Sequence, residues 1–322
     1  MIRLDGVTKS YRGKTVVKDL SLEIKEGETC VLLGPSGCGK STTLRMINRL
    51  VVPDRGEIFI EGRNVKNYDL LELRRRIGYV IQSVGLFPHL TVAENVGILL
   101  KYLKWPKKKI SQRVEELLAL VRLDPDVYKN RYPHELSGGE AQRVGVARAL
   151  AADPPILLMD EPFGALDPKT REQLQSEFAN LKRLLKKTIV FVTHDVYEAV
   201  IMGDKIAILK DGELQQYAEP LQIWHNPAND FVASFVGAEF GFHVLSRFCL
   251  KEIDCDPVKD HSYEEMLLPR FNPSTNLKVV VAEMIRKRST KAFVVLDGKP
   301  QGIVTFERII DYIRRAGHGS SC

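Results

Sequence analysis

The fold of this chain is decided by the stretch Gly34-Pro35-Ser36-Gly37-Cys38-Gly39-Lys40-Ser41-Thr42. The apolar run at residues 29–33 precedes it and indicates a strand buried on both faces, and residues 43–50 after it repeat apolar side chains at helical spacing. The stretch therefore reads G-x-x-x-x-G-K-S between a strand and a helix, which is the context that a phosphate-binding loop requires. The alternative, a chance glycine-rich turn, is disfavoured because loop, lysine, hydroxyl and flanking elements all agree.

The chemistry of this loop predicts a bound polyphosphate group and Mg²⁺. Its glycines let successive backbone N–H groups turn inward around a phosphate, and the helix N-terminus adds partial positive charge. Lys40 reaches the β- and γ-phosphates, and Ser41 is left to ligate Mg²⁺. The predicted nucleotide contacts from this loop are Gly34, Pro35, Ser36, Gly37, Cys38, Gly39, Lys40, Ser41 and Thr42.

Length and composition bound the class of protein. A chain of 322 residues is expected to form about two domains, and its 44% content of hydrophobic residues suffices for a packed core. No run reaches the roughly 18 apolar residues of a membrane-spanning helix, and residues 1–5 do not begin an export signal, so we expect a soluble or peripheral protein. The net charge of +6 is spread over both signs, which is typical of a solvated surface. The five cysteines have no metal-ligand spacing, and reduced cytosolic thiols are the simplest interpretation.

Short strands joined by turns open the chain and predict an antiparallel layer beside the phosphate loop. Tyr11 lies in the first turn, where its ring either stacks on a nucleotide base or packs as an edge residue. A further strand follows at residues 77–81 and ends at Gln82.

Residues 83–150 change character toward helix, and this segment closes on a second glycine pair. Ser137 and Glu140 form an S-x-x-E capping box that starts a helix there. Gly138 and Gly139 leave the N–H groups of this helix uncovered, which indicates a second anion site. A capping box without any ligand is the other interpretation, and in isolation it is the stronger one.

Acidic residues and a histidine follow two later apolar strands. Asp160 and Glu161 end the strand at residues 155–159, at the edge where open α/β sheets bind ligands. One carboxylate can hold Mg²⁺ while the other accepts a proton from an attacking water, although acidic residues at strand ends also serve merely as helix caps. His194 follows the strand at residues 187–193 and is placed to touch a γ-phosphate.

Together these motifs resemble the nucleotide-binding subunit of ABC transporters over residues 1–236, with agreement in order and spacing. The matched motifs are Walker A at 34–42, the Q-loop glutamine Gln82, the signature at 136–140, the Walker B pair Asp160 and Glu161, the D-loop at 165–167 and the switch His194. Tyr11 stands where the family has its adenine-stacking aromatic. The fold implied is α/β: a P-loop NTPase with a RecA-like core, an antiparallel β-subdomain and a helical signature subdomain at about 83–150.

The resemblance also implies roles for individual residues. Two subunits would form a head-to-tail homodimer with two ATP molecules at the interface, each between the Walker A motif of one chain and the signature of the other. Ser137, Gly138 and Gly139 would bind the γ-phosphate held by the partner. The catalytic set would be Glu161 as general base, His194 to hold the γ-phosphate and orient water, Lys40, and Gln82 to sense Mg²⁺ and the transport subunit. Asp167 of the D-loop would also contact nucleotide, and the metal ligands would be Ser41, Gln82 and Asp160.

The sequence departs from the family pattern at two positions. Glu140 replaces the usual glutamine of the signature, and because glutamate completes the capping box we expect little loss. Gly164 stands where a serine commonly precedes the D-loop, which puts any polar contact of that side chain in doubt.

The transported cargo is a finer question than the fold. Residues 77–82, 85–91, 226–232 and 235–237 look like the importers of glycine betaine, choline, carnitine or proline. Such a subunit would be peripheral at the cytoplasmic face of the cell membrane, bound to membrane-spanning permease subunits, served indirectly by an extracytoplasmic substrate-binding protein, and without a nucleic-acid partner. An importer of another cargo, such as an amino acid, polyamine or metal chelate, is the alternative. A soluble ABC ATPase of DNA repair or translation is disfavoured, because the chain has neither a long heptad insertion nor two cassettes.

The remaining residues predict a small α+β domain. Residues 237–270 read as a linker, and residues 271–316 give helix, hairpin and helix, which resembles a single cystathionine-β-synthase-type (CBS) motif. We expect residues 317–322 to form a flexible tail. Arg308 stands where nucleotide-binding members of that class have an aspartate. This domain is hypothesised to dimerise or regulate, with a basic face that either meets an anion or is simply solvated; that face comprises Arg286, Lys287, Arg288 and Lys291.

Overall fold

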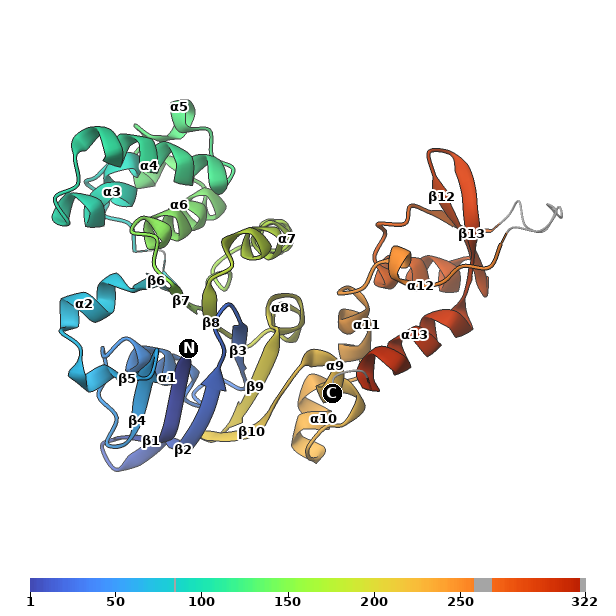
Figure 1. Ribbon diagram of the computed structural model, residues 1–322, viewed down its shortest axis with the longest axis horizontal. Coiled ribbons are helices and arrows are strands. Elements are labelled where there is room, and N and C mark those ends of the chain that lie inside the picture. Colours follow the sequence, from blue (N-terminus) through green and yellow to red (C-terminus); the bar gives the residue numbers. More distant parts are fainter. Residues whose placement is uncertain (84, 258–267, 319–322) are drawn as a thin grey trace. The chain divides into compact units, whose positions relative to one another are not determined.

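The computed structural model describes residues 1–83, 85–257 and 268–318. Its contacts divide the chain into two compact units, Met1–Tyr217 and Ala218–Cys322 (Figure 1). The last residues of the predicted tail, and part of the predicted linker, lie outside the described residues. In the described part of the chain, no helix is both long and apolar enough to cross a bilayer.

The first unit is built on a six-stranded sheet in the order β10-β9-β3-β8-β7-β6. Its strands are β3 (Thr29–Leu33), β6 (Ile77–Val80), β7 (Ile156–Asp160), β8 (Thr188–Thr193), β9 (Lys205–Lys210) and β10 (Glu213–Ala218). β3, β7 and β8 are buried along their whole length, as the apolar runs predict. β3 pairs in parallel with β8 and β9, and β7 pairs in parallel with β6 and β8. The loops that follow β3, β6, β7 and β8 therefore meet at one edge of the sheet.

The predicted antiparallel layer is a second sheet in the order β2-β1-β4-β5. It comprises β1 (Ile2–Tyr11), β2 (Lys14–Ile24), β4 (Arg55–Ile60) and β5 (Arg63–Asn64). β1 and β2 are joined by Arg12 and Gly13, whose φ angles are 49° and 81°, as the tight hairpin connection between twisted strands requires. The buried faces of these strands share one hydrophobic core with α1 (Lys40–Ile47) and the apolar strands of the large sheet.

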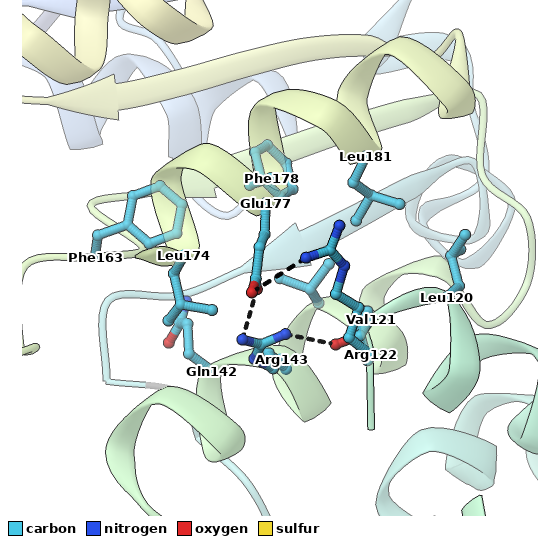
Figure 2. A pocket seen from close by; sticks show the side chains of 11 residues that line it. Leu120, Val121, Arg122, Gln142, Arg143, Phe163, Leu174, Glu177, Phe178 and Leu181 are labelled. Carbon is cyan, nitrogen blue, oxygen red and sulfur yellow. Dashed lines mark hydrogen bonds and ion pairs between the residues drawn. The ribbon is translucent and has the colours of Figure 1, made fainter. Parts of the chain in front are cut away.

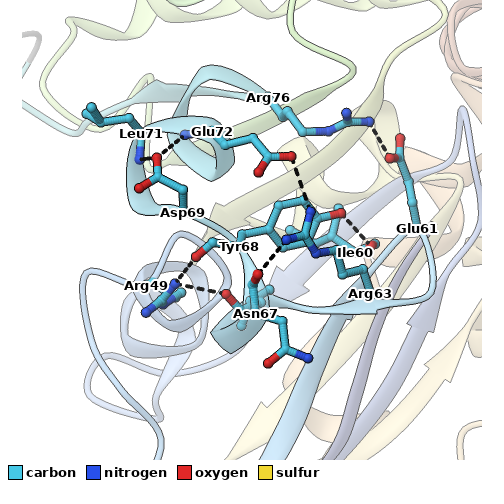
Figure 3. A network of polar contacts seen from close by, with 11 residues as sticks. Arg49, Ile60, Glu61, Arg63, Asn67, Tyr68, Asp69, Leu71, Glu72 and Arg76 are labelled. Carbon is cyan, nitrogen blue, oxygen red and sulfur yellow. Dashed lines mark hydrogen bonds and ion pairs between the residues drawn. The ribbon is translucent and has the colours of Figure 1, made fainter.

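A network of polar contacts connects the antiparallel sheet to the segment after α1, to η1 (Val65–Asn67) and to the loop before α2 (Leu70–Arg75) (Figure 3). Arg49, just beyond α1, donates from Nη1 to the carbonyl oxygens of Val65 at 3.0 Å and Tyr68 at 2.8 Å. The Tyr68 hydroxyl in turn donates to the Ile60 carbonyl at 3.1 Å. Arg49 thus joins the helix after the phosphate loop to the loop that leads into α2.

Replacement of Arg49 by alanine should destabilise the chain by about 2 kcal/mol, because both carbonyls lose a charged donor. Urea unfolding at fixed pH measures this change. The control Arg75→Ala removes an exposed arginine at the end of α2 and should change the free energy of unfolding by less than about 0.5 kcal/mol. Equal midpoints for the Arg49 variant and the parent would contradict the role assigned to these hydrogen bonds.

Helices form a separate subdomain beyond β6, shown in green in Figure 1. Its elements are α3 (Val92–Tyr102), α4 (Lys107–Leu120), α5 (Pro125–Tyr128), η2 (Pro133–Glu135) and α6 (Gly138–Leu150). Two further helices, α7 (Pro168–Leu185) and α8 (Val196–Met202), follow β7 and β8. The helical subdomain predicted from residue 83 to 150 is therefore present.

A small cavity of about 40 Å³ lies where α6 meets α7 (Figure 2). Glu177 on α7 pairs with Arg143 on α6 at 2.5 Å and with Arg122 at 3.5 Å. Arg143 also donates to the Val121 carbonyl at 3.0 Å. This ion pair fixes the helix that begins at the signature against the helix that begins at the D-loop.

The second unit contains the predicted helix, hairpin and helix. These are α12 (Leu277–Arg286), β12 (Lys291–Leu296), β13 (Lys299–Thr305) and α13 (Phe306–His318), with β11 (Arg270–Phe271) parallel to β12. Before them come α9 (Pro220–His225), α10 (Asp230–Val236), α11 (Phe240–Leu245) and η3 (Leu250–Glu252).

Two features of this unit differ from the sequence expectation. The predicted linker contains α11 and η3, and Phe240, Val244 and Leu250 are buried there. The contacts also group α9 and α10 with the second unit, whereas the sequence places the boundary after residue 236. Helices of six or seven residues span too few turns for an apolar period to be recognised, which explains why neither feature could be predicted from the sequence.

Candidate active site

The phosphate loop runs from the end of β3 to the start of α1 and depends on glycine at two positions. Gly34 has φ 155°, and a Cβ there would lie 2.2 Å from the Leu209 carbonyl oxygen. Gly39 has φ 102°, and a Cβ there would lie 2.4 Å from the Val16 carbonyl oxygen. The loop therefore follows this path only because both residues lack a side chain.

Lys40 is buried within this loop and supplies its positive charge. Its Nζ donates to the carbonyl oxygens of Gly34 at 2.7 Å and Pro35 at 2.9 Å, and lies 3.8 Å from Cys38 Sγ. Burial raises the pKa of the Cys38 thiol, and the neighbouring ammonium of Lys40 opposes that rise. A buried ammonium beside the first residues of α1 is the charge arrangement that suits a phosphate group.

Ser41 and Asp160, both predicted as metal ligands, are in direct contact. The Ser41 hydroxyl donates to Asp160 Oδ1 at 2.7 Å. Burial raises the pKa of the phenol of Tyr79 on β6, and the charge of Asp160 raises it further. A hydroxyl and a carboxylate side by side next to a phosphate loop are the oxygen donors that Mg²⁺ prefers, so the residues present fit this ion.

Glu161 lies at the centre of the predicted catalytic residues. Its Oε2 accepts a hydrogen bond from Gln82 Nε2 at 3.1 Å and lies 3.3 Å from His194 Nδ1. The Glu161 N–H donates to the Val192 carbonyl at 3.0 Å, which holds the residue against β8. The structure thus brings together three side chains that lie far apart in the sequence, on the loops after β6, β7 and β8. Gln82, which is also predicted as a metal ligand, donates its amide hydrogen bond to Glu161.

The D-loop lies beside this cluster. Asp167 caps α7 by accepting a hydrogen bond from the Thr170 N–H at 3.1 Å, and hydrogen bonds from Thr170 lower the pKa of its carboxyl. A Cβ on Gly164 would lie 3.6 Å from Glu161 Oε2 and 3.8 Å from Gln82 Nε2, which is ordinary contact distance. Glycine at this position therefore leaves room next to the Glu161 carboxylate.

The signature residues stand at the start of α6, well away from α1 (Figure 1). The predicted capping box is present: the Glu140 N–H donates to Ser137 Oγ at 3.3 Å, and the Ser137 N–H donates to Glu140 Oε2 at 2.7 Å. Tyr128, which the sequence did not indicate, donates from its hydroxyl to Glu140 Oε1 at 2.5 Å. This bond and those from Ser137 lower the pKa of the Glu140 carboxyl.

Tyr11 lies at the exposed end of β1, with 46% of its surface accessible. The ammonium of Lys9 lies 5.4 Å from the centre of its ring. The tyrosine is therefore not an inward-packed edge residue, and its ring is free on the surface of the β-subdomain.

Replacing Tyr128 by phenylalanine should lower the free energy of unfolding by about 1 kcal/mol at pH 7. The depressed pKa of Glu140 means that its stabilising contribution is present above the unfolded-state pKa and is lost as the pH falls through the folded-state value. The difference between variant and parent should therefore shrink in acid. Urea unfolding across this pH range measures it, with the exposed Tyr102→Phe as the matched control. A difference that stays constant with pH would contradict the link to Glu140.

The fold and this cluster define a P-loop nucleotide-binding protein. A sequence model of the ABC transporter family matches residues 17–164. A dimeric ATP-binding cassette, MJ0796, solved in a post-hydrolysis state with ADP and Pi, superimposes with a TM-score of 0.61 at 39% identity, covering 68% of this chain and 98% of that one. The chain belongs to the ABC transporter family of ATP-binding proteins.

Two relatives narrow the comparison. The glycine betaine/carnitine/choline transport ATP-binding protein OpuCA of Bacillus subtilis is 56% identical over 240 residues, which are 74% of this chain and 63% of OpuCA. The osmoprotectant import ATP-binding protein OsmV of Salmonella typhimurium is 46% identical over 311 residues, which are 94% of this chain and 79% of OsmV. The chain thus matches somewhat under two thirds of the length of OpuCA.

Proposed function

We propose that this chain is the ATP-hydrolysing subunit that energises an importer of quaternary-amine osmoprotectants, of the glycine betaine, choline, carnitine and proline class. The observation that carries the catalytic part is the shared oxygen of Glu161, which contacts both Gln82 and His194 beside the Ser41 and Asp160 pair. The family and the transport relatives support the cargo class.

In this proposal the residues at the edge of the large sheet bind the nucleotide and position the attacking water. Lys40 would exchange its carbonyl partners for the β- and γ-phosphates. Ser41 and Asp160 would hold Mg²⁺, which would supply positive charge to neutralise the phosphates. Tyr11 stacks on the adenine with its exposed ring. Glu161 accepts the proton of the attacking water, while His194 holds the γ-phosphate and orients that water. Gln82 would sense both Mg²⁺ and the transport subunit, and would thereby couple hydrolysis to transport.

A second copy of the chain completes the site in this proposal. Ser137, Gly138 and Gly139 at the start of α6 would contact the γ-phosphate held by the partner, together with Asp167 of the D-loop. The distance between α6 and α1 within one chain supports this arrangement, and so does the dimeric cassette among the solved relatives. Permease subunits in the membrane, reached by an extracytoplasmic binding protein, would receive the energy at the cytoplasmic face.

The second unit contributes a CBS-like motif in this proposal. Its helix, hairpin and helix order matches the motif, and the unit would dimerise or regulate the transporter. Arg308, at the position of the expected aspartate, forms an ion pair with Asp256 and donates to the Asp254 carbonyl at 2.9 Å. Because the guanidinium is engaged within its own unit, we infer that this position does not bind a ribose, and dimerisation or regulation both stay open for the unit.

The variant Glu161→Gln should keep ATP binding and lose hydrolysis by about a hundredfold or more, because the amide cannot accept the proton of water. It should also accumulate as an ATP-bound dimer. Steady-state phosphate release and size-exclusion chromatography with ATP measure the two effects. Glu172→Gln, an exposed carboxylate on α7, is the control and should retain both properties of the parent. Undiminished turnover in Glu161→Gln would rule out the assignment of the base.

The cargo is tested by ATP-driven uptake into vesicles that hold this chain with the membrane subunit encoded beside it. The panel contains betaine, choline, carnitine, proline, spermidine and amino acids. Uptake of a quaternary amine, lost in Glu161→Gln, is expected. Uptake of spermidine or an amino acid alone would overturn the cargo class and leave the ATPase assignment intact.

A further inference from the structure

A buried carboxylate, Glu198, lies four residues after the switch histidine His194 and has no part in the mechanism above. Glu198 lies on α8 with only 4% of its surface accessible. Both of its oxygens accept hydrogen bonds: Oε2 from the Thr193 hydroxyl, and Oε1 from Gln175 Nε2 at 2.9 Å. Thr193 and Gln175 are themselves buried. Burial raises the pKa of the Glu198 carboxyl, the charge of Asp195 raises it further, and the hydrogen bonds and Arg171 oppose the rise.

On one side, this network includes Thr193 and Asp195, the residues before and after His194. Thr193 is the last residue of β8, and its Oγ1 accepts a hydrogen bond from the Asp195 N–H at 3.0 Å. Asp195 caps α8 by accepting from the N–H groups of Tyr197 at 2.7 Å and Glu198 at 3.1 Å. His194 therefore sits between two residues whose positions are fixed by the same buried carboxylate and its helix.

The other side of the network reaches the D-loop. Gln175 lies on α7, one turn after Arg171, whose Nη2 donates to the carbonyl oxygens of Leu166 at 3.0 Å and Gly164 at 3.5 Å. Residues 164–167 are thus connected through α7 to Gln175, which in turn donates to Glu198. The bond between Gln175 and Glu198 joins buried groups, where hydrogen bonds are strongest, and the bond from Arg171 to the Leu166 carbonyl is partly buried.

A carboxylate in this position is costly, and packing alone does not require it. Burying a charged group without partners is unfavourable, and an apolar side chain of similar size fills the same volume at no such cost. What the carboxylate provides is a pair of acceptors that fix the Thr193 hydroxyl and the Gln175 amide in one geometry. The network therefore specifies a geometry in addition to filling space.

We propose that Glu198 is a positioning residue, which sets the orientation of His194 beside Glu161 through Thr193 and couples it to the D-loop through Gln175 and α7. This inference rests on the proposed role of His194 in hydrolysis. Because the Glu198 carboxylate is buried and accepts its hydrogen bonds from Thr193 and Gln175, we expect its effect to be on the rate of the chemical step and not on the binding of ATP.

A shape-conserving change at Thr193 tests the first link. Thr193→Val keeps the side-chain volume and removes the hydroxyl, so that Glu198 loses one donor and the Asp195 N–H loses its acceptor. In the full chain, kcat for ATP should fall about tenfold to a hundredfold while KM changes little, since misplacement by about 1 Å has effects of this size. Thr193→Ser retains the hydroxyl and should restore most of the rate. Equal rates for the valine and serine variants would overturn the proposal.

A double-mutant cycle tests whether the effect passes through His194. Glu198→Gln should lower the rate of single-turnover hydrolysis in the parent and leave the residual rate of His194→Ala unchanged. A reduction by the same factor in both backgrounds, which is what a general loss of stability produces, would overturn the proposal, as would no reduction in the parent. If His194→Ala alone were as active as the parent, the assigned role of His194 and the present inference would both fail. Loss of activity in His194→Ala with full activity in Glu198→Gln would remove only the present inference.

Discussion

The site depends on the register between the parallel strands of the large sheet. β3 and β8 pair so that Leu33 lies opposite Thr193, and β7 and β8 pair so that Asp160 lies opposite Val192. Gly34 in the phosphate loop and His194 therefore leave the sheet at the same level, and Glu161 leaves it one residue earlier. A shift of one residue in either pairing would turn each side chain to the opposite face and separate the phosphate loop from the groups that act on the phosphate.

A second constraint is the backbone at Glu161, whose φ of 44° is uncommon for a residue with a side chain. Asp160 and Glu161 are consecutive, yet Asp160 contacts Ser41 while Glu161 contacts Gln82 and His194. The left-handed conformation turns the chain between the two carboxylates and gives each its own partners. The two adjacent carboxylates are thus divided between the pair with Ser41 and the cluster with Gln82 and His194, which avoids the repulsion of like charges sharing one position.

The parts of the fold that depend on residues close together in the sequence could be predicted from it. The phosphate loop, the apolar strands and the capping box at Ser137 each depend on residues within a few positions of one another, and the structure contains all of them. It also placed Asp160, Glu161 and His194 at strand ends, from which their proximity followed by the rule for parallel sheets.

Contacts between distant residues could not be predicted in the same way. Tyr128 on Glu140, and Gln175 and Thr193 on Glu198, are ordinary polar residues in sequence, and only the packing of their helices brings them together. The short helix α11 gave too few turns for a period, and the extent of the second unit followed from its contacts rather than from its composition.

The start of α1 and the start of α6 meet the same physical requirement in different ways. Each helix leaves N–H groups without partners in its first turn, and each must satisfy them with something outside the helix. At α1 no acidic residue lies in the first turn, and the ammonium of Lys40 adds to the positive end of the helix. At α6 the carboxylate of Glu140 bonds the N–H and hydroxyl of Ser137 and is itself held by Tyr128. Glutamate in place of glutamine therefore keeps the capping geometry. In the proposed site, an anion that reaches Ser137 would have to compete with Glu140 for its hydroxyl. We therefore expect the start of α6 to bind an anion more weakly than the start of α1.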